Sequence, residues 1–296
     1  MKKVIACIMA TAFLFATMEV ALKIGGANYD SLQLTFLRFF IGGLVLLPFG
    51  IQEYRAKQAA FERSYISGRD WLWLLLVGTM CIPISMLCFQ LGVERSNAAT
   101  ASAIICMNPI FTMIIAHIFT TEKMSRAKYF TVTMAMAACF FLMKPWDIQE
   151  GNTTAGLTLT LIAAITFGAY TVMGKKTLAK IGTFAQTSFS FILGSLVLLI
   201  VMLFMGRPIL DGITDHPLVL AYVGVMVTGI GYLTYFLAIK WSDATTGSLA
   251  FFIKPGIAPI IAIIVLHESV QWNTILGIGL FFVGSFVTLR DNFRNR

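Results

Sequence analysis

Long apolar segments separated by short polar ones recur along the whole chain. Most run for about 20 residues, the length of an α-helix that crosses the roughly 30 Å hydrocarbon core of a bilayer. Because a segment in lipid must satisfy its own backbone hydrogen bonds, we expect each to be helical. The pattern predicts an all-α integral membrane protein with ten transmembrane helices. The predicted spans are residues 4–22, 32–51, 71–92, 98–119, 130–143, 155–173, 184–205, 218–239, 244–266 and 275–289.

Composition supports a membrane protein and excludes an ordinary soluble one. Of the 296 residues, 58% are hydrophobic and 12% are charged, whereas a soluble domain carries about 25% charged residues. The longest polar connection, residues 52–70, is too short to form a soluble domain. No CxxC motif or Cys/His spacing indicates a metal site.

The basic residues predict the orientation, because Lys and Arg concentrate in cytoplasmic loops. With the N-terminus inside, 16 of the 22 Lys and Arg residues fall in cytoplasmic segments and four fall in outer ones. The remaining two, Arg38 and Lys254, lie within predicted spans. Both termini are therefore predicted to be cytoplasmic, and the net charge of +8 needs no nucleic-acid partner.

The chain also repeats itself. A shift of 146 residues aligns residues 91–122 on residues 237–268 without a gap, with 11 identities in 32 positions. A shift of 152 aligns the earlier part of the two halves. A bias toward leucine does not produce matched polar residues and prolines. These matched pairs include Ser96/Ser242, Thr100/Thr246, Ser102/Ser248, Pro109/Pro255 and Glu122/Glu268.

Each repeat contains five predicted helices, so the second copy enters the membrane from the opposite side. The first repeat spans residues 1–147 and the second spans residues 148–296. Inverted repeats of this kind are typical of secondary transporters, whose substrate site lies near the midplane between the repeats. A receptor or a structural membrane protein needs no such symmetry.

Short segments in both halves carry a resemblance to a known family. They are Phe15-Ala16, Phe167-Gly168, Arg38, MNPIFTMIIAHIFTTE at residues 107–122 and IKPGIAPIIAIIVLHE at residues 253–268. With these features the chain resembles the ten-helix EamA-type exporters of the drug/metabolite transporter superfamily, and the similarity covers nearly its whole length. Glu19 departs from it, since many members have a neutral residue there.

The resemblance implies transport without naming the cargo, because the family moves amino acids, nucleotide precursors, sugars, polyamines and toxic organic compounds. It also implies that aromatic residues on several helices line a central cavity, although ordinary packing explains each of them as well. These residues are Phe13, Phe89, Tyr170, Tyr232 and Tyr235.

Charged residues inside a span are costly and mark functional sites by default. Glu19 and Arg38 lie at the same predicted depth on adjacent antiparallel helices, so we expect them to pair. Two readings stay open: the pair joins the first two helices, or Glu19 is also a proton site that alternates with substrate.

Lys254 lies near the middle of its span, and its repeat counterpart is Asn108. Each directly precedes a proline, Pro255 or Pro109, which removes one helical hydrogen bond and is expected to kink the helix. The two polar side chains are predicted to form the floor of the cavity, or Lys254 serves as a counter-ion to Glu19.

Two further glutamates, Glu122 and Glu268, end their helices at opposite faces and are expected to cap the turn or helix that follows.

The sequence therefore predicts a transporter and not an enzyme. We expect a secondary active or facilitative exporter of a small metabolite, such as an amino acid or another carboxylate-bearing compound, working by alternating access. No cofactor is expected, and proton coupling is one hypothesis. The setting is the cell membrane of a prokaryote, with a monomer or a homodimer as the assembly. The alternative function is a flippase for a lipid-linked precursor.

Overall fold

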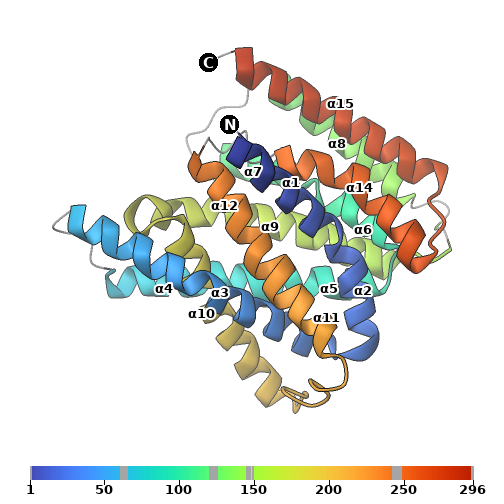
Figure 1. Cartoon of the computed structure of the whole chain (residues 1–296). Helices are drawn as coiled ribbons and strands as arrows, with labels where there is room; N and C mark the ends of the chain where they lie inside the picture. Colours follow the sequence, from blue (N-terminus) through green and yellow to red (C-terminus); the bar gives the residue numbers. More distant parts are fainter. Residues whose placement is uncertain are drawn as a thin grey trace.

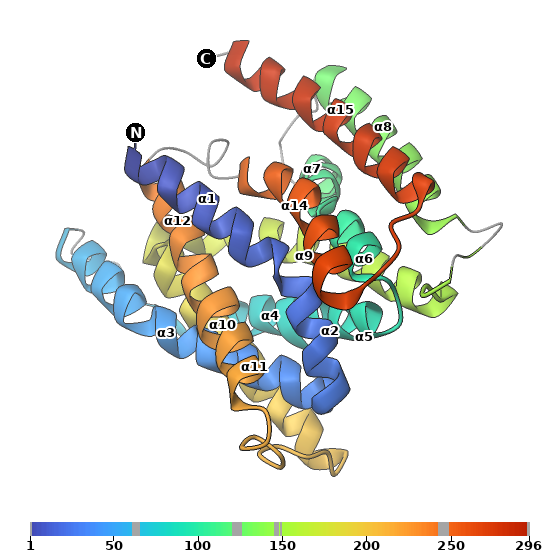
Figure 2. The same cartoon turned by 45° about the vertical axis from the view of Figure 1, so that its right-hand side comes forward.

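A computed structural model of the chain describes residues 2–60, 66–119, 126–144, 148, 150–241 and 249–294. Every regular element within these ranges is a helix, and the helices pack into one bundle (Figures 1 and 2). Both views place the two chain ends toward the same end of the molecule, where α1 and α15 approach them.

The helical bounds follow the predicted spans closely. The first half contains α1 (Lys2–Ala16), α2 (Met18–Asn28), α3 (Ser31–Ala60), α4 (Gly68–Thr79), the π-helix η1 (Met80–Met86), α5 (Leu87–Glu94), α6 (Ala98–Ile105), α7 (Asn108–Phe119) and α8 (Arg126–Met143). The second half contains α9 (Thr154–Ile181), α10 (Thr183–Phe204), α11 (Pro217–Ala221), the π-helix η2 (Tyr222–Ile230), α12 (Gly231–Trp241), α14 (Leu249–Leu266) and α15 (Trp272–Arg294).

A multi-pass helical membrane architecture is confirmed. Among the described residues, seven helical segments are long and apolar enough to cross a membrane, and three shorter apolar helices accompany them. The long segments are Lys2–Asn28, Ser31–Ala59, Gly68–Glu94, Ala98–Phe119, Thr154–Gly174, Thr183–Phe204 and Pro217–Ala238. The shorter ones are Tyr129–Met143, Ile253–Leu266 and Trp272–Gly284. The count of ten spans and the cytoplasmic position of both termini stay predictions.

Several of the long segments are interrupted where the chain approaches the centre of the bundle. The fourth segment breaks at Cys106 and Met107, just before Pro109, so that α7 starts at Asn108. The third segment contains η1, which holds Pro83, and the seventh contains η2. By contrast, α14 runs through both of its prolines as a single helix. Interruptions of this kind loosen the regular backbone hydrogen bonding locally.

Contacts between the two halves come in corresponding sets. Helix α1 packs against α12 and α14, and α9 packs against α5 and α7. In the same way α3 packs against η2, and α10 packs against α4. Two further pairs join equivalent helices, α3 with α10 and α8 with α15. The last pair lies side by side along one edge of the bundle in both views (Figures 1 and 2).

A carboxylate near the end of the chain caps a helix in the first half. Glu268 accepts hydrogen bonds from the backbone N–H groups of Ala98 (3.1 Å) and Ala99 (3.5 Å), at the start of α6. It also pairs with Lys23, whose Nζ lies 2.5 Å from its Oε1. A carboxylate is favourable there because the first N–H groups of a helix lack partners.

The expectation that Glu268 caps the turn or helix that follows it was therefore wrong. The helix it caps begins 170 positions earlier in the chain, and sequence order alone gave no sign of that neighbour. The corresponding expectation for Glu122 falls outside the described residues.

Close backbone approach fixes how α4 packs against α10. A Cβ added at Gly78 would lie 2.2 Å from the carbonyl oxygen of Ser190, and one added at Gly194 would lie 2.3 Å from that of Gly78. Small residues let membrane helices approach this closely, and the contact is lost when either side chain grows.

We predict that Gly78→Ala lowers the melting temperature of the purified protein, because α4 must move away from α10. Overpacking typically costs about 1–3 kcal/mol. The control is Gly279→Ala on α15, where nothing lies within 4 Å of the added Cβ, and this variant should melt at or above the wild-type temperature. Melting is monitored by tryptophan fluorescence. Equal melting temperatures of the two variants would show that the α4–α10 contact is not tight.

Candidate functional site

Two opposite charges meet in the interior of the bundle. Glu19, on α2, and Lys254, on α14, are 235 positions apart in sequence, and the Nζ of Lys254 lies 2.5 Å from the Oε1 of Glu19. Only 1% of Glu19 and 2% of Lys254 is exposed. The second oxygen of this carboxylate, Oε2, is buried and makes no hydrogen bond to the described part of the chain.

The predicted pairing of Glu19 with Arg38 is wrong. Glu19 is bound by Lys254, which was the alternative role considered for that lysine. Arg38, on α3, is 1% exposed, and its NH1 lies 3.9 Å from the sulfur of Met18. Counting residues along two antiparallel helices estimates the depth of a side chain in the membrane, but it does not tell which neighbour the side chain faces.

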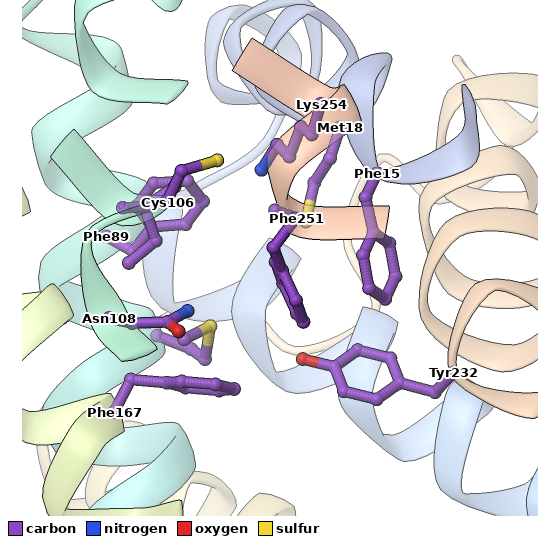
Figure 3. Close-up of a pocket in the computed structure, with 11 residues that line it drawn as sticks. Phe15, Met18, Phe89, Cys106, Asn108, Phe167, Tyr232, Phe251 and Lys254 are labelled. Carbon is purple, nitrogen blue, oxygen red and sulfur yellow. The ribbon is translucent and has the colours of Figure 1, made fainter. Parts of the chain in front are cut away.

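A small cavity lies next to the ion pair. Its volume is about 30 Å³, which leaves room for about two water molecules. It is mainly apolar, with polar groups from Asn108, Tyr232 and Lys254 (Figure 3). A metabolite enters it only after the surrounding helices separate. The lining residues are Phe15, Met18, Met86, Phe89, Ile105, Cys106, Asn108, Phe167, Tyr232, Phe251 and Lys254.

Aromatic rings form much of the cavity wall. Phe15 lies at the centre of one cluster, with its ring centroid 5.2 Å from that of Tyr232 and 5.8 Å from that of Phe251. Phe89 and Phe167 face the cavity from the other side, near Asn108 (Figure 3). Such a wall suits an apolar or aromatic body, and the few polar groups would orient it.

The structure brings some of the predicted site residues to this cavity and leaves others behind it. Lys254, Asn108 and Phe89 line it. Tyr170 and Tyr235 are not in the lining but contact residues that are: the ring centroid of Tyr170 lies 5.2 Å from that of Phe167, and that of Tyr235 lies 5.4 Å from that of Phe251.

Three more predicted residues stand apart from the lining. Phe13 is 54% exposed on the outer surface of α1. Pro109 follows Asn108 in the first turn of α7, and Pro255 follows Lys254 within α14.

Several lining residues were missed by residue-by-residue inspection, yet the internal repeat contains a signal for them. The 152-residue shift relates Phe15 to Phe167, and the 146-residue shift relates the other matched positions. Four such pairs have both members in the lining. They are Phe15/Phe167, Met86/Tyr232, Ile105/Phe251 and Asn108/Lys254.

The arrangement is suited to binding. Among the described residues, no group of three His, Cys, Asp or Glu side chains lies close enough to hold a metal ion. The site contains an aromatic wall, the amide of Asn108 and the ion pair. The attraction within this pair would be lost if either partner lost its charge. A change of charge at Glu19 or Lys254 would therefore alter the packing of α2 against α14.

Known proteins resemble this chain over nearly its full length. Residues 2–144 and residues 154–290 match the EamA-like transporter family. This chain belongs to that family. A transporter of Clostridium kluyveri, whose function is uncharacterised, is 32% identical over 99% of this chain and 94% of its own length.

More distant relatives of this EamA-like chain cover its full length as well. A probable terminal-alkyne amino-acid exporter of Streptantibioticus cattleyicolor is 20% identical over 100% of this chain and 96% of its own. A solved crystal structure shares the fold with a TM-score of 0.65, at 16% identity over 97% of this chain and 96% of the other. The chain is thus a membrane protein of a transporter family.

We predict that Lys254→Met strongly destabilises the protein, because it leaves Glu19 charged and alone in the interior. Losing one partner of a buried pair typically costs about 3–5 kcal/mol. Glu19→Gln should destabilise for the same reason, and the double variant should regain part of the loss. A thermal-melting cycle of the four proteins measures this coupling. Additive losses would mean that the two charges do not depend on each other.

Proposed function

We propose that this EamA-like protein is a secondary transporter that exports a small carboxylate-bearing metabolite by alternating access. An amino acid is one such compound. The observation that carries the proposal is the aromatic cavity beside the buried Glu19–Lys254 pair. The amino-acid exporter among its relatives supports the same substrate class.

Alternating access requires two halves that rock about a central site, and we propose that residues 1–147 and 148–296 are these halves. In this proposal they form inverted repeats of five helices each, with both termini in the cytoplasm of a prokaryotic cell. The corresponding helix contacts in the two halves support it. So do the four repeat-related pairs in the lining, since a site on a symmetry axis draws equivalent residues from each repeat.

The charges favour an anionic group on the substrate. Glu19, Arg38 and Lys254 are buried together in the first, second and ninth predicted spans, and with Glu19 ionised they sum to +1. A carboxylate compensates this field, whereas a cationic compound adds to it.

Proton coupling follows from the same pair in this proposal. Protonation of Glu19 would remove the attraction for Lys254 and free the ammonium group for the substrate. The coupling ion would then be a proton, and no cofactor would be needed. The two predicted roles of Glu19, structural partner and proton site, are thereby combined in one residue.

A second candidate, a flippase for a lipid-linked precursor, has one observation in its favour. An apolar groove of about 320 Å³ lies between α7, α8 and α9, lined by residues such as Met107, Ile110 and Leu161. Its residues Met136 and Phe140 are more than half exposed on the outer surface. A lipid chain could occupy such a groove while its head group reached the cavity.

Counterflow in proteoliposomes tests the proposal. We predict uptake of labelled carboxylate metabolites from an amino-acid and organic-acid panel, with a rate that changes between pH 5.5 and pH 8. Glu19→Gln should flatten this pH response because the proton site is gone, and Phe13→Leu, on the outer surface, should retain it.

Two outcomes would contradict parts of this proposal. Transfer of a fluorescent lipid-linked sugar between leaflets, without metabolite counterflow, would favour the flippase. Counterflow with an unchanged pH response in Glu19→Gln would assign the proton coupling elsewhere.

A further inference from the structure

Arg38 is a buried cation whose hydrogen-bonding capacity is largely unused. It is 1% exposed, yet its Nε and NH2 atoms make no hydrogen bond to the described part of the chain. Within the described ranges, its third nitrogen, NH1, has only the sulfur of Met18, at 3.9 Å, as a contact of this kind. A guanidinium carries five N–H donors and stays protonated, so this leaves a charged fork without an acceptor.

The groups around Arg38 do not neutralise it. Its guanidinium carbon lies 4.4 Å from the centre of the Phe39 ring, a cation–π contact. Tyr232 and Cys81 are close enough to interact electrostatically, and both are neutral side chains. The acid that interacts electrostatically with Arg38, Glu19, is held by Lys254. A cation–π contact offsets only part of the cost of burying a charge, so the fork is suited to an anion from outside the chain.

Met18 connects this fork to the cavity. Its side chain lines the cavity, and its sulfur is the atom that NH1 contacts. Figure 3 shows Met18 extending between Lys254 and Phe251. Tyr232 also lines the cavity and lies beside Arg38. Methionine is flexible and a weak acceptor, so an oxygen anion replaces it at a guanidinium with a large gain.

We propose that Arg38 binds the carboxylate of the substrate. Without substrate, the Met18 sulfur occupies the place of this carboxylate at the guanidinium. The carboxylate displaces the Met18 sulfur from NH1 and accepts two hydrogen bonds, from NH1 and NH2 of Arg38. This inference rests on the proposed transport function and adds a substrate class. Since Glu19 and Lys254 neutralise each other, Arg38 leaves a charge of +1, and the site prefers a net monoanion to a zwitterion.

Three ligands of nearly the same shape test the charge preference: phenyllactate is a monoanion, phenylalanine is a zwitterion, and phenyllactamide is neutral. Binding is measured by calorimetry on the full chain in nanodiscs. We expect phenyllactate to bind the most tightly. Arg38→Gln should weaken it by more than about tenfold, because a bidentate charged pair is lost, and should leave phenyllactamide unchanged. Arg38→Lys should weaken it less than Arg38→Gln does.

A second measurement does not depend on any ligand. Met18→Glu places a tethered carboxylate beside the Arg38 fork, and Met18→Gln is the neutral control of the same size. We expect Met18→Glu to melt at a higher temperature than Met18→Gln and to lose phenyllactate binding. The difference in melting should disappear in an Arg38→Gln background.

The results separate failure of this inference from failure of the proposed function. Equal melting of Met18→Glu and Met18→Gln, or phenyllactate binding that Arg38→Gln leaves intact, would overturn the carboxylate site even if transport is observed. No binding of phenyllactate to the wild-type chain would overturn the monoanion preference. If Met18→Glu stabilises the protein but the wild-type chain shows no counterflow, the carboxylate site at Arg38 is supported and the transport proposal is contradicted.

Discussion

The buried pair of Glu19 and Lys254 is the interaction on which the central arrangement depends. Each charge alone would be costly in the interior, and each becomes tolerable only when the other is in contact with it. The helix that carries Glu19 must therefore lie against α14, although the two are far apart in the chain. That contact brings the first and second halves together at one point and sets the position of the cavity beside it.

The chemistry of the centre lies where the two halves differ. At the repeat-related positions, Glu19 corresponds to Thr171, Arg38 to Ser190 and Lys254 to Asn108. Each buried charge thus has an uncharged counterpart in the other half. The other repeat-related residues in the lining, mostly aromatic and aliphatic, form the wall of the cavity, while these three residues carry the charge of the centre.

Much of the fold could be predicted from the sequence, because an apolar segment of about 20 residues in lipid satisfies its own backbone hydrogen bonds as a helix. The repeat, seen in Pro109/Pro255 among other pairs, contained the signal for half-to-half pairs in the lining. The partner of Glu19 could not be predicted in the same way. It depends on how α2, α3 and α14 rotate about their axes, and this follows from the packing of all the helices together. The cap that Glu268 provides for α6 was hidden for the same reason.

The distance in sequence between Glu19 and Lys254 also has a consequence for biosynthesis. The chain enters the membrane from its N-terminus, and Lys254 is made 235 residues after Glu19. Until then Glu19 lacks its partner, and a charge at the centre of a membrane helix costs about 2.5–3.5 kcal/mol on insertion scales. Helix α2 therefore reaches its final place only after the ninth predicted span has been made. Assembly of the centre is therefore a late event, and it waits for nearly the whole chain.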